Sequence, residues 1–259
     1  KIILPTNLLS KYGYDVLGEY KPEQLSLDAP RLKFLEKHLG LQGLKVTEIG
    51  SNLGFFCLQL AEKHQAFVTG FEPIESYARA STLMANLLSL PNQNCEFISS
   101  GVTLSDVSFI GNCDLMIELN VMHHAGSLFD CEVVENSGGW IQYATKRLAA
   151  IREKAKYLYF QTGNMKNGMP LFASENSIEV VAEILENSGW SVDAVGMLKD
   201  LSKQNLDYES YLMSDINDIP RYQCRRNSQI DKVEYVDLQT GITNSLATGL
   251  GNRPLWICS

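Results

Sequence analysis

The stretch Glu48-Ile49-Gly50-Ser51-Asn52-Leu53-Gly54 decides the fold of this 259-residue chain. It follows a short apolar run at 44–49, which predicts a strand, and it leads into 53–63, where apolar residues recur at helical spacing. Gly50 and Gly54 let the backbone turn sharply and approach a ligand closely, because neither carries a Cβ. Two glycines alone are a weak signal, since many such turns use glycine. The stretch therefore predicts a strand–loop–helix unit whose role depends on the rest of the chain.

The same alternation of strand and helix patterns continues along the chain. Further strands are expected at 66–71, 95–99, 114–119, 157–161, 190–195 and 254–258. Helices are expected at 74–90, 140–154 and 174–188. This order implies right-handed crossovers that place helices on both faces of one sheet. We therefore expect an α/β fold with a doubly wound, mostly parallel sheet of seven strands.

Two segments lie outside this repeat and suggest a division of the chain. We expect an N-terminal cap at 1–43, a ligand-binding α/β core at 44–195, an insertion at 196–252 and the final core strand at 253–259. Within the insertion, the patterns predict a helix around 207–216 and a hairpin from 221–226 and 232–238. Because insertions at the ligand edge of a fold commonly carry specificity, we expect substrate recognition there.

An acidic residue stands at the end of each of the first two expected strands. Glu48 can accept hydrogen bonds from an ammonium group, and Asn52 can bind a carboxylate at the helix start. Glu72 follows 22 residues after Gly50 and can accept hydrogen bonds from both hydroxyls of a ribose. It can also cap the helix that begins near Ile74. The joint spacing favours ribose binding.

Polar residues follow the fourth expected strand. His123 and His124 lie at the ligand edge, where a neutral imidazole can remove a proton from a hydroxyl. Neighbouring side chains at a turn diverge, so both cannot easily be the base, and either can instead bind a loop carbonyl. Asn120 is polar on an otherwise apolar strand and is expected to face the ligands.

Together these features resemble the class I S-adenosylmethionine-dependent methyltransferases. In that family an acid, a glycine-rich loop and a second acid one strand later precede a fourth strand that often begins with Asp and ends in a His-His turn. The matching residues are Glu48, Gly50, Gly54, Glu72, Asp114, His123 and His124. Residues 253–258 resemble the family's final antiparallel strand. The resemblance implies that S-adenosylmethionine is the cofactor and that Ser51 and Asn52 also lie in its site.

The chain departs from the family pattern at two positions. Asn52 replaces the middle glycine of the usual three, which implies a modified contact with the methionine part of the cofactor. No Asp follows the third strand at 98–102 to meet the adenine amino group. Ser100, Val102 or a backbone carbonyl are the candidates for that contact.

Composition restricts the partners that this chain can bind. The net charge of −8 and the pI near 5.1 disfavour nucleic acid, although Arg225 and Arg226 keep it open. The six cysteines are scattered without a disulfide or zinc pattern, so no metal site is expected. No run of 18 apolar residues occurs, and we expect a cytoplasmic protein without a membrane span. The sequence does not indicate an oligomeric state.

Among methyltransferases, the stretch 54–61, the His-His turn and the closing Arg-Pro-aromatic strand look most like enzymes of bacterial polysaccharide and sugar pathways. This resemblance favours O-methylation of a sugar, glycan or small metabolite. A second resemblance is to enzymes that transfer a carboxymethyl group to the wobble uridine of tRNA. An NAD-dependent oxidoreductase and a non-catalytic nucleoside-binding module remain alternatives, although 50–54 lacks the G-x-G-x-x-G spacing of dinucleotide sites.

Overall fold

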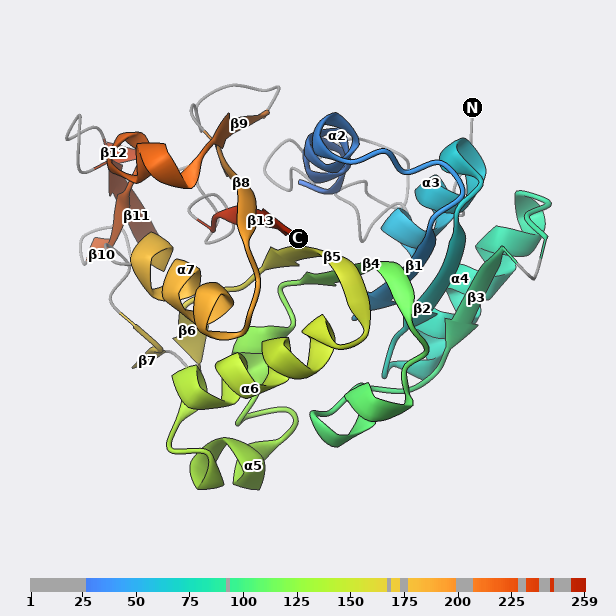
Figure 1. Cartoon of the computed structure of the whole chain (residues 1–259), viewed down its shortest axis with the longest axis horizontal. Coiled ribbons are helices and arrows are strands. Elements are labelled where there is room, and N and C mark those ends of the chain that lie inside the picture. Colours follow the sequence, from blue (N-terminus) through green and yellow to red (C-terminus); the bar gives the residue numbers. More distant parts are fainter. Residues whose placement is uncertain are drawn as a thin grey trace.

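The fold is built around one sheet with helices on both faces (Figure 1). The computed structural model describes residues 27–91, 94–166, 169–172, 177–198, 207–227, 232–237, 243–244 and 253–259. Residues 1–26 of the expected cap and much of the expected insertion lie outside the described residues. No helix in the described segments is long and apolar enough to cross a membrane.

The main sheet has eight strands. They are β1 (Lys45–Ile49), β2 (Phe67–Phe71), β3 (Cys95–Ile98), β4 (Cys113–Leu119), β5 (Ala155–Gln161), β8 (Val192–Leu198), β9 (Tyr208–Tyr211) and β13 (Leu255–Cys258). Their order in the sheet is β3-β2-β1-β4-β5-β13-β8-β9. The first five strands pair in parallel, whereas β13 is antiparallel to both β5 and β8. The expected doubly wound, mostly parallel sheet is confirmed, with β9 as an eighth strand at one edge.

The helices cover the sheet on both sides. They are α2 (Asp28–His38), α3 (Phe55–His64), α4 (Glu75–Leu87), α5 (Cys131–Asn136), α6 (Trp140–Arg152) and α7 (Ser177–Asn187). Helix α3 contacts α2 and α4, whereas α6 contacts α5 and α7. Because the strand order runs outward in both directions from β1 and β4, right-handed crossovers place these two groups on opposite faces. A short hairpin of β6 (Met165–Lys166) and β7 (Met169–Pro170) follows β5.

The core lies on both faces of the central strands. Leu115, Met116 and Ile117 are consecutive on β4 and fully buried. Trp256 on β13 is also fully buried. Consecutive buried apolar residues are typical of a parallel sheet that helices cover on both sides.

The expected helix at 207–216 is wrong. The chain forms strand β9 there, followed by a 3-10 helix, η5 (Met213–Asp218). Strand β9 pairs antiparallel with β8, and its Tyr208 is buried, so pairing with an available sheet edge outweighs the local helical pattern. The expected hairpin is confirmed as β10 (Tyr222–Asn227) and β11 (Lys232–Asp237), with β12 (Thr243–Asn244) beside β11.

Candidate functional site

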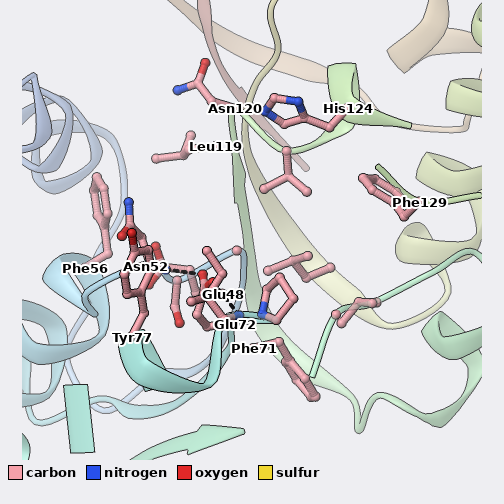
Figure 2. Close-up of a pocket in the computed structure, with 18 of the residues that line it drawn as sticks. Glu48, Asn52, Phe56, Phe71, Glu72, Tyr77, Leu119, Asn120, His124 and Phe129 are labelled. Atoms are coloured by element: carbon pink, nitrogen blue, oxygen red, sulfur yellow. Dashed lines mark hydrogen bonds between the residues drawn. The ribbon is translucent and has the colours of Figure 1, made fainter. Parts of the chain in front are cut away.

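A cavity of about 560 Å³ opens at the carboxyl ends of β1, β2 and β4. Ligands of doubly wound sheets bind at the point where the strand order reverses, which here lies between β1 and β4. Figure 2 shows Asn120 and His124 at one side of this cavity and Tyr77, with Glu72, at another. The volume is within the range of small-molecule sites.

The loop after β1 forms the cavity floor. The main-chain N–H groups of Gly50 and Ser51 both donate to the carbonyl of Phe71, at 2.8 and 3.0 Å. Gly50 has a φ of +75°, and a Cβ there would lie 2.4 Å from Cγ2 of Val121. Only glycine therefore fits between the end of β4 and the cavity.

The second glycine of the motif has a different position. Gly54 does not line the cavity, although sequence reasoning placed it in the cofactor site. It has a φ of +74° at the start of α3, and a Cβ there would lie 2.7 Å from the ring of Phe97 and 3.0 Å from Cβ of Ser81. Gly54 thus permits close packing of α3 against its neighbours.

Glu72 lies at the cavity wall and accepts hydrogen bonds from two backbone segments. Its Oε1 accepts a hydrogen bond from the Ile74 N–H at 2.9 Å, and its Oε2 accepts one from the Asn52 N–H at 2.8 Å. The side chain is buried and lines the cavity. Each carboxylate oxygen has a further lone pair, so Glu72 can hold the loop and still accept hydrogen bonds from a ligand.

Glu48 is a buried carboxyl group at the cavity wall. The thiol of Cys57 donates to its Oε2 at 2.9 Å. Burial raises the pKa of Glu48 to about 8; the thiol hydrogen bond opposes this shift, and the carboxylates of Asp28 and Glu72 add to it. Glu48 is therefore largely protonated at neutral pH in the absence of a cation, and a bound cation would favour its ionised form.

Asn120 joins three parts of the sheet at the cavity edge. Its Nδ2 donates to Oε1 of Gln161 at 2.9 Å, and its Oδ1 accepts from Nη1 of Arg253 at 2.7 Å. Its backbone is left-handed, with a φ of +60°. These contacts fix the end of β4 against β5 and against the residue that leads into β13.

The two histidines are placed differently. His124 is exposed and lines the cavity, whereas His123 is buried and does not. Nδ1 of His123 accepts a hydrogen bond from the Gly163 N–H at 3.3 Å, and the two imidazole rings are 4.1 Å apart. Burial and the charge of Arg253 lower the pKa of both, to about 3 for His123. His123 therefore has a structural position, and His124 is a neutral imidazole that faces the cavity.

The segment after β3 forms another wall. Gly101, Val102 and Thr103 line the cavity, but Ser100 does not, and its hydroxyl donates to the Gly101 carbonyl at 3.0 Å. The Val102 carbonyl accepts from Nη1 of Arg147 at 3.0 Å. Gly101, Val102 and Thr103 thus line the cavity, whereas Ser100 does not.

Several lining residues escaped the sequence analysis. They are Asp28, Arg31, Phe55, Phe56, Tyr77, Leu128 and Phe129. Asp28 and Arg31 come from α2, which precedes the glycine loop in sequence and reaches the cavity only through packing. Asp28 and Arg31 are spaced i, i+3 on one helix, which is the only local signal that links them.

The sheet topology matches the arrangement implied by the resemblance, with antiparallel β13 between β5 and β8. The chain thus has a doubly wound α/β sheet with one antiparallel strand inserted beside β5. No protein-family model matches this chain, and no curated protein sequence does.

Three of the solved structures that are similar to this chain are methyltransferases. A SAM-dependent methyltransferase from Aquifex aeolicus is 18% identical, over 75% of this chain and 93% of that chain, with a TM-score of 0.47. Magnesium protoporphyrin IX methyltransferase from Synechocystis PCC 6803 with bound SAM is 16% identical, over 80% and 83%, with a TM-score of 0.48. An O-methyltransferase of a Brevibacillus brevis trans-AT PKS multienzyme is 14% identical, over 65% and 53%, with a TM-score of 0.44. At these identities and TM-scores the similarity identifies neither the reaction nor the substrate of this chain.

Proposed function

We propose that this chain is an S-adenosylmethionine-dependent methyltransferase that methylates a hydroxyl group of a sugar, glycan or small metabolite. One observation carries the proposal: Glu48 and Glu72, at the ends of β1 and β2, face one cavity across a loop in which Gly50 admits no Cβ. A nucleoside joined to an amino acid requires one acceptor for its ammonium group and another for its ribose hydroxyls. Between these two acceptors, the protein backbone must approach the ligand closely.

The residues of the cavity fit the cofactor part by part. Glu48 would bind the ammonium group, because a buried carboxyl group gains most from a cation that ionises it. Glu72 would bind the ribose hydroxyls through the lone pairs that its backbone contacts leave free. Val102 and Phe129 offer apolar surface for the adenine base. When bound, the cofactor supplies an electrophilic methyl group on its sulfonium.

His124 is the candidate for the base. It lines the cavity beside Asn120, and its lowered pKa keeps the imidazole neutral and able to accept the proton of a hydroxyl. Orientation of the acceptor by the cavity walls would supply the rest of the rate enhancement. A hydroxyl acceptor suits this arrangement, and the resemblance to sugar-pathway enzymes supports a sugar or glycan.

Calorimetric titration tests the cofactor. We expect S-adenosylhomocysteine to bind and NAD to give no heat, because the loop lacks the spacing of a pyrophosphate site. Binding of NAD together with no response to S-adenosylhomocysteine would contradict the proposal and favour an oxidoreductase.

Methyl transfer from labelled S-adenosylmethionine to hydroxyl, amine and phosphate acceptors, with tRNA included, tests the reaction. With the acceptor that works, His124→Ala should lower kcat about 10²- to 10⁴-fold while S-adenosylhomocysteine binding is retained. The matched control is His64→Ala, because His64 pairs with Glu36 and does not line the cavity. Transfer to tRNA alone would favour the wobble-uridine alternative, and binding without transfer to any acceptor would favour a non-catalytic module.

A further inference from the structure

Asn120 lies in a chain of hydrogen bonds whose two ends both belong to Arg253. Nη1 of Arg253 donates to Oδ1 of Asn120 at 2.7 Å. Nδ2 of Asn120 donates to Oε1 of Gln161 at 2.9 Å, and Nε2 of Gln161 donates to the main-chain carbonyl of Arg253 at 2.8 Å. Because a guanidinium can only donate and a carbonyl can only accept, the ends of the chain fix the orientation of both amides. The Asn120 amide cannot turn over without the loss of two of these hydrogen bonds.

One N–H of the Asn120 amide remains for a ligand. The amide nitrogen carries two hydrogens, and the contact with Gln161 uses one of them. This nitrogen makes no other hydrogen bond within the described part of the chain. Asn120 is partly exposed and lines the cavity, whereas Gln161 is fully buried, and neither Gln161 nor Arg253 lines the cavity. The two partners thus hold the amide from the protein side, which leaves its second N–H to the cavity.

His124 lines the cavity from the turn that follows Asn120. Its main-chain N–H donates to the Val121 carbonyl at 3.0 Å, so the chain folds back on itself directly after Asn120. Figure 2 shows the side chains of Asn120 and His124 at the same side of the cavity. Burial, and after it the charge of Arg253, lower the pKa of His124. This side of the cavity therefore combines an amide donor with a neutral imidazole, which has one nitrogen that can accept a proton.

We propose that Asn120 donates its second N–H to the oxygen atom of the methyl acceptor, and that Arg253 and Gln161 are positioning residues that hold the amide in that orientation. The inference rests on the proposed function and names what selects the acceptor atom. A hydroxyl oxygen has two lone pairs, of which one accepts from Asn120 and the other attacks the methyl carbon. The new C–O bond forms as the C–S bond breaks with its electron pair left on sulfur, and the hydroxyl proton passes to His124.

The same contact disfavours an amine as the acceptor. A neutral primary amine has a single lone pair, and attack on the methyl carbon uses it. An amine therefore cannot accept from Asn120 while it reacts, and the amide donor is left without a partner at a cost in rate. The fixed orientation of Asn120 thus selects oxygen over nitrogen at the same position.

A crystal structure of the complex with S-adenosylhomocysteine tests the contact without an acceptor. Water is the probe, because it has the donors and the lone pairs of a hydroxyl group. We expect an ordered water molecule about 2.7–3.2 Å from both Nδ2 of Asn120 and a ring nitrogen of His124. The proposal is overturned if Nδ2 donates its second hydrogen to the cofactor or to another protein group, or if no water molecule contacts both side chains.

Methyl transfer to an alcohol and to the amine of the same carbon skeleton tests the selectivity. Asn120→Asp replaces the donor with an oxygen that can accept from an amine, so it should lower the alcohol-to-amine ratio of kcat/KM about 10-fold or more. Arg253→Met lets the amide turn over and should lower the same ratio, whereas Arg253→Lys keeps a group that only donates and should retain it. A merely structural role would lower both rates together and leave the ratio unchanged. Asn136→Asp, which alters an exposed asparagine of α5 outside the cavity lining, is the matched control and should not change the ratio.

The outcomes distinguish this inference from the proposed function. If the wild-type protein does not bind S-adenosylhomocysteine, the proposed function fails and this inference fails with it. If S-adenosylhomocysteine binds but either the shared water molecule or the change in ratio is missing, this inference is overturned and the proposed function stands. Far-ultraviolet circular dichroism and the melting temperature of each variant check folding, and the wild-type crystal structure decides the question even if the variants do not fold.

Discussion

The main-chain N–H of Asn52 donates to Oε2 of Glu72 at 2.8 Å, which joins the loop after β1 to the end of β2. Asn52 has a φ of +51°, so its N–H points at the carboxylate only because the loop takes a left-handed turn there. The acid that lines the cavity is therefore also the residue that fixes the shape of the loop after β1. Changes at either position should affect stability and binding together.

Glu72→Gln should both destabilise the protein and weaken cofactor binding. Glutamine keeps one oxygen acceptor, but its NH₂ group would meet the N–H of Asn52 or Ile74, so one buried hydrogen bond is lost at a cost of about 1–3 kcal/mol. We expect S-adenosylhomocysteine binding to weaken about 10-fold or more and the urea midpoint to fall. Glu75→Gln, which alters an exposed acid in the first turn of α4, is the control and should change both quantities little. Unchanged affinity in Glu72→Gln would rule out the ribose contact.

Gly50→Ala should be much more harmful than Gly43→Ala. Both glycines have a positive φ, +75° and +69°, so each alanine incurs backbone strain on the order of 1–3 kcal/mol. At Gly50 the added Cβ would also clash with Cγ2 of Val121, at 2.4 Å. At Gly43 no atom lies within 4 Å of the added Cβ. Urea unfolding of both variants measures the difference. In the double variant Gly50→Ala/Val121→Ala, the stability lost to the steric clash should be recovered, whereas the loss from backbone strain should remain. If the second substitution recovers no stability, the clash is absent.

The stability of the ligand-free protein should fall as pH rises from about 5 to 8. Glu48 has a pKa of about 8 in the folded chain against a usual 4.5, so between these values the folded state binds more protons than the unfolded state. Stability contributed by the protonated form is thus present at low pH and is lost as pH rises through 8. Urea titrations at several pH values measure the slope. Glu48→Gln cannot ionise and should have a flatter profile, and equal slopes would contradict the raised pKa.

Cofactor binding near pH 7 should release a proton. If the ammonium group ionises Glu48, the carboxyl group gives up the proton that it holds in the empty cavity. Calorimetry of S-adenosylhomocysteine in buffers with different ionisation enthalpies measures the number of protons released. Glu48→Gln should abolish that release, whereas retention of the release in the variant would assign it to another group.

Arg147→Ala should strongly destabilise the wall that contains Val102. The ion pair of Arg147 and Glu118 is fully buried, with 3.4 Å between Nε and Oε1, and Arg147 also donates to the Val102 carbonyl. Removal of one partner leaves a buried charge unpaired, which costs about 3–5 kcal/mol. The control is Arg79→Ala, whose exposed pair with Glu75 should contribute about 0–1 kcal/mol. Urea unfolding measures the free energy of unfolding of both variants. If Arg147→Ala lowers it by less than about 1 kcal/mol, the prediction is contradicted, because the surrounding wall then relaxes around the missing side chain.

Much of the core fold could be predicted from local patterns. Strands β1, β2 and β4 lie where apolar runs predicted them, because residues buried on both faces must be apolar in succession. The glycine loop and the acid at the end of β2 were predicted from spacing alone, since the turn needs residues without a Cβ and the strand end has a fixed place in such a sheet. The helix expected at 207–216 failed because strand pairing with β8 is a non-local interaction.

The candidate site was only partly predictable. Sequence spacing indicated Glu48, Gly50 and Glu72, which line the cavity, but it could not separate His124 from His123, because the pair is adjacent and only the fold buries one of them. It also missed Arg31, which lies on a helix with no glycine or strand signal beside it.

The sequence by itself determined the strand–loop–helix unit at 44–63, because backbone turns and strand burial depend on neighbouring residues. Only the tertiary structure decided which side chains share the cavity. It brought Arg31 and Asp28 of α2 to the ends of β1 and β2, moved Gly54 out of the cavity and turned His123 into the protein. These outcomes depend on packing between segments that are distant in sequence, which no local pattern encodes.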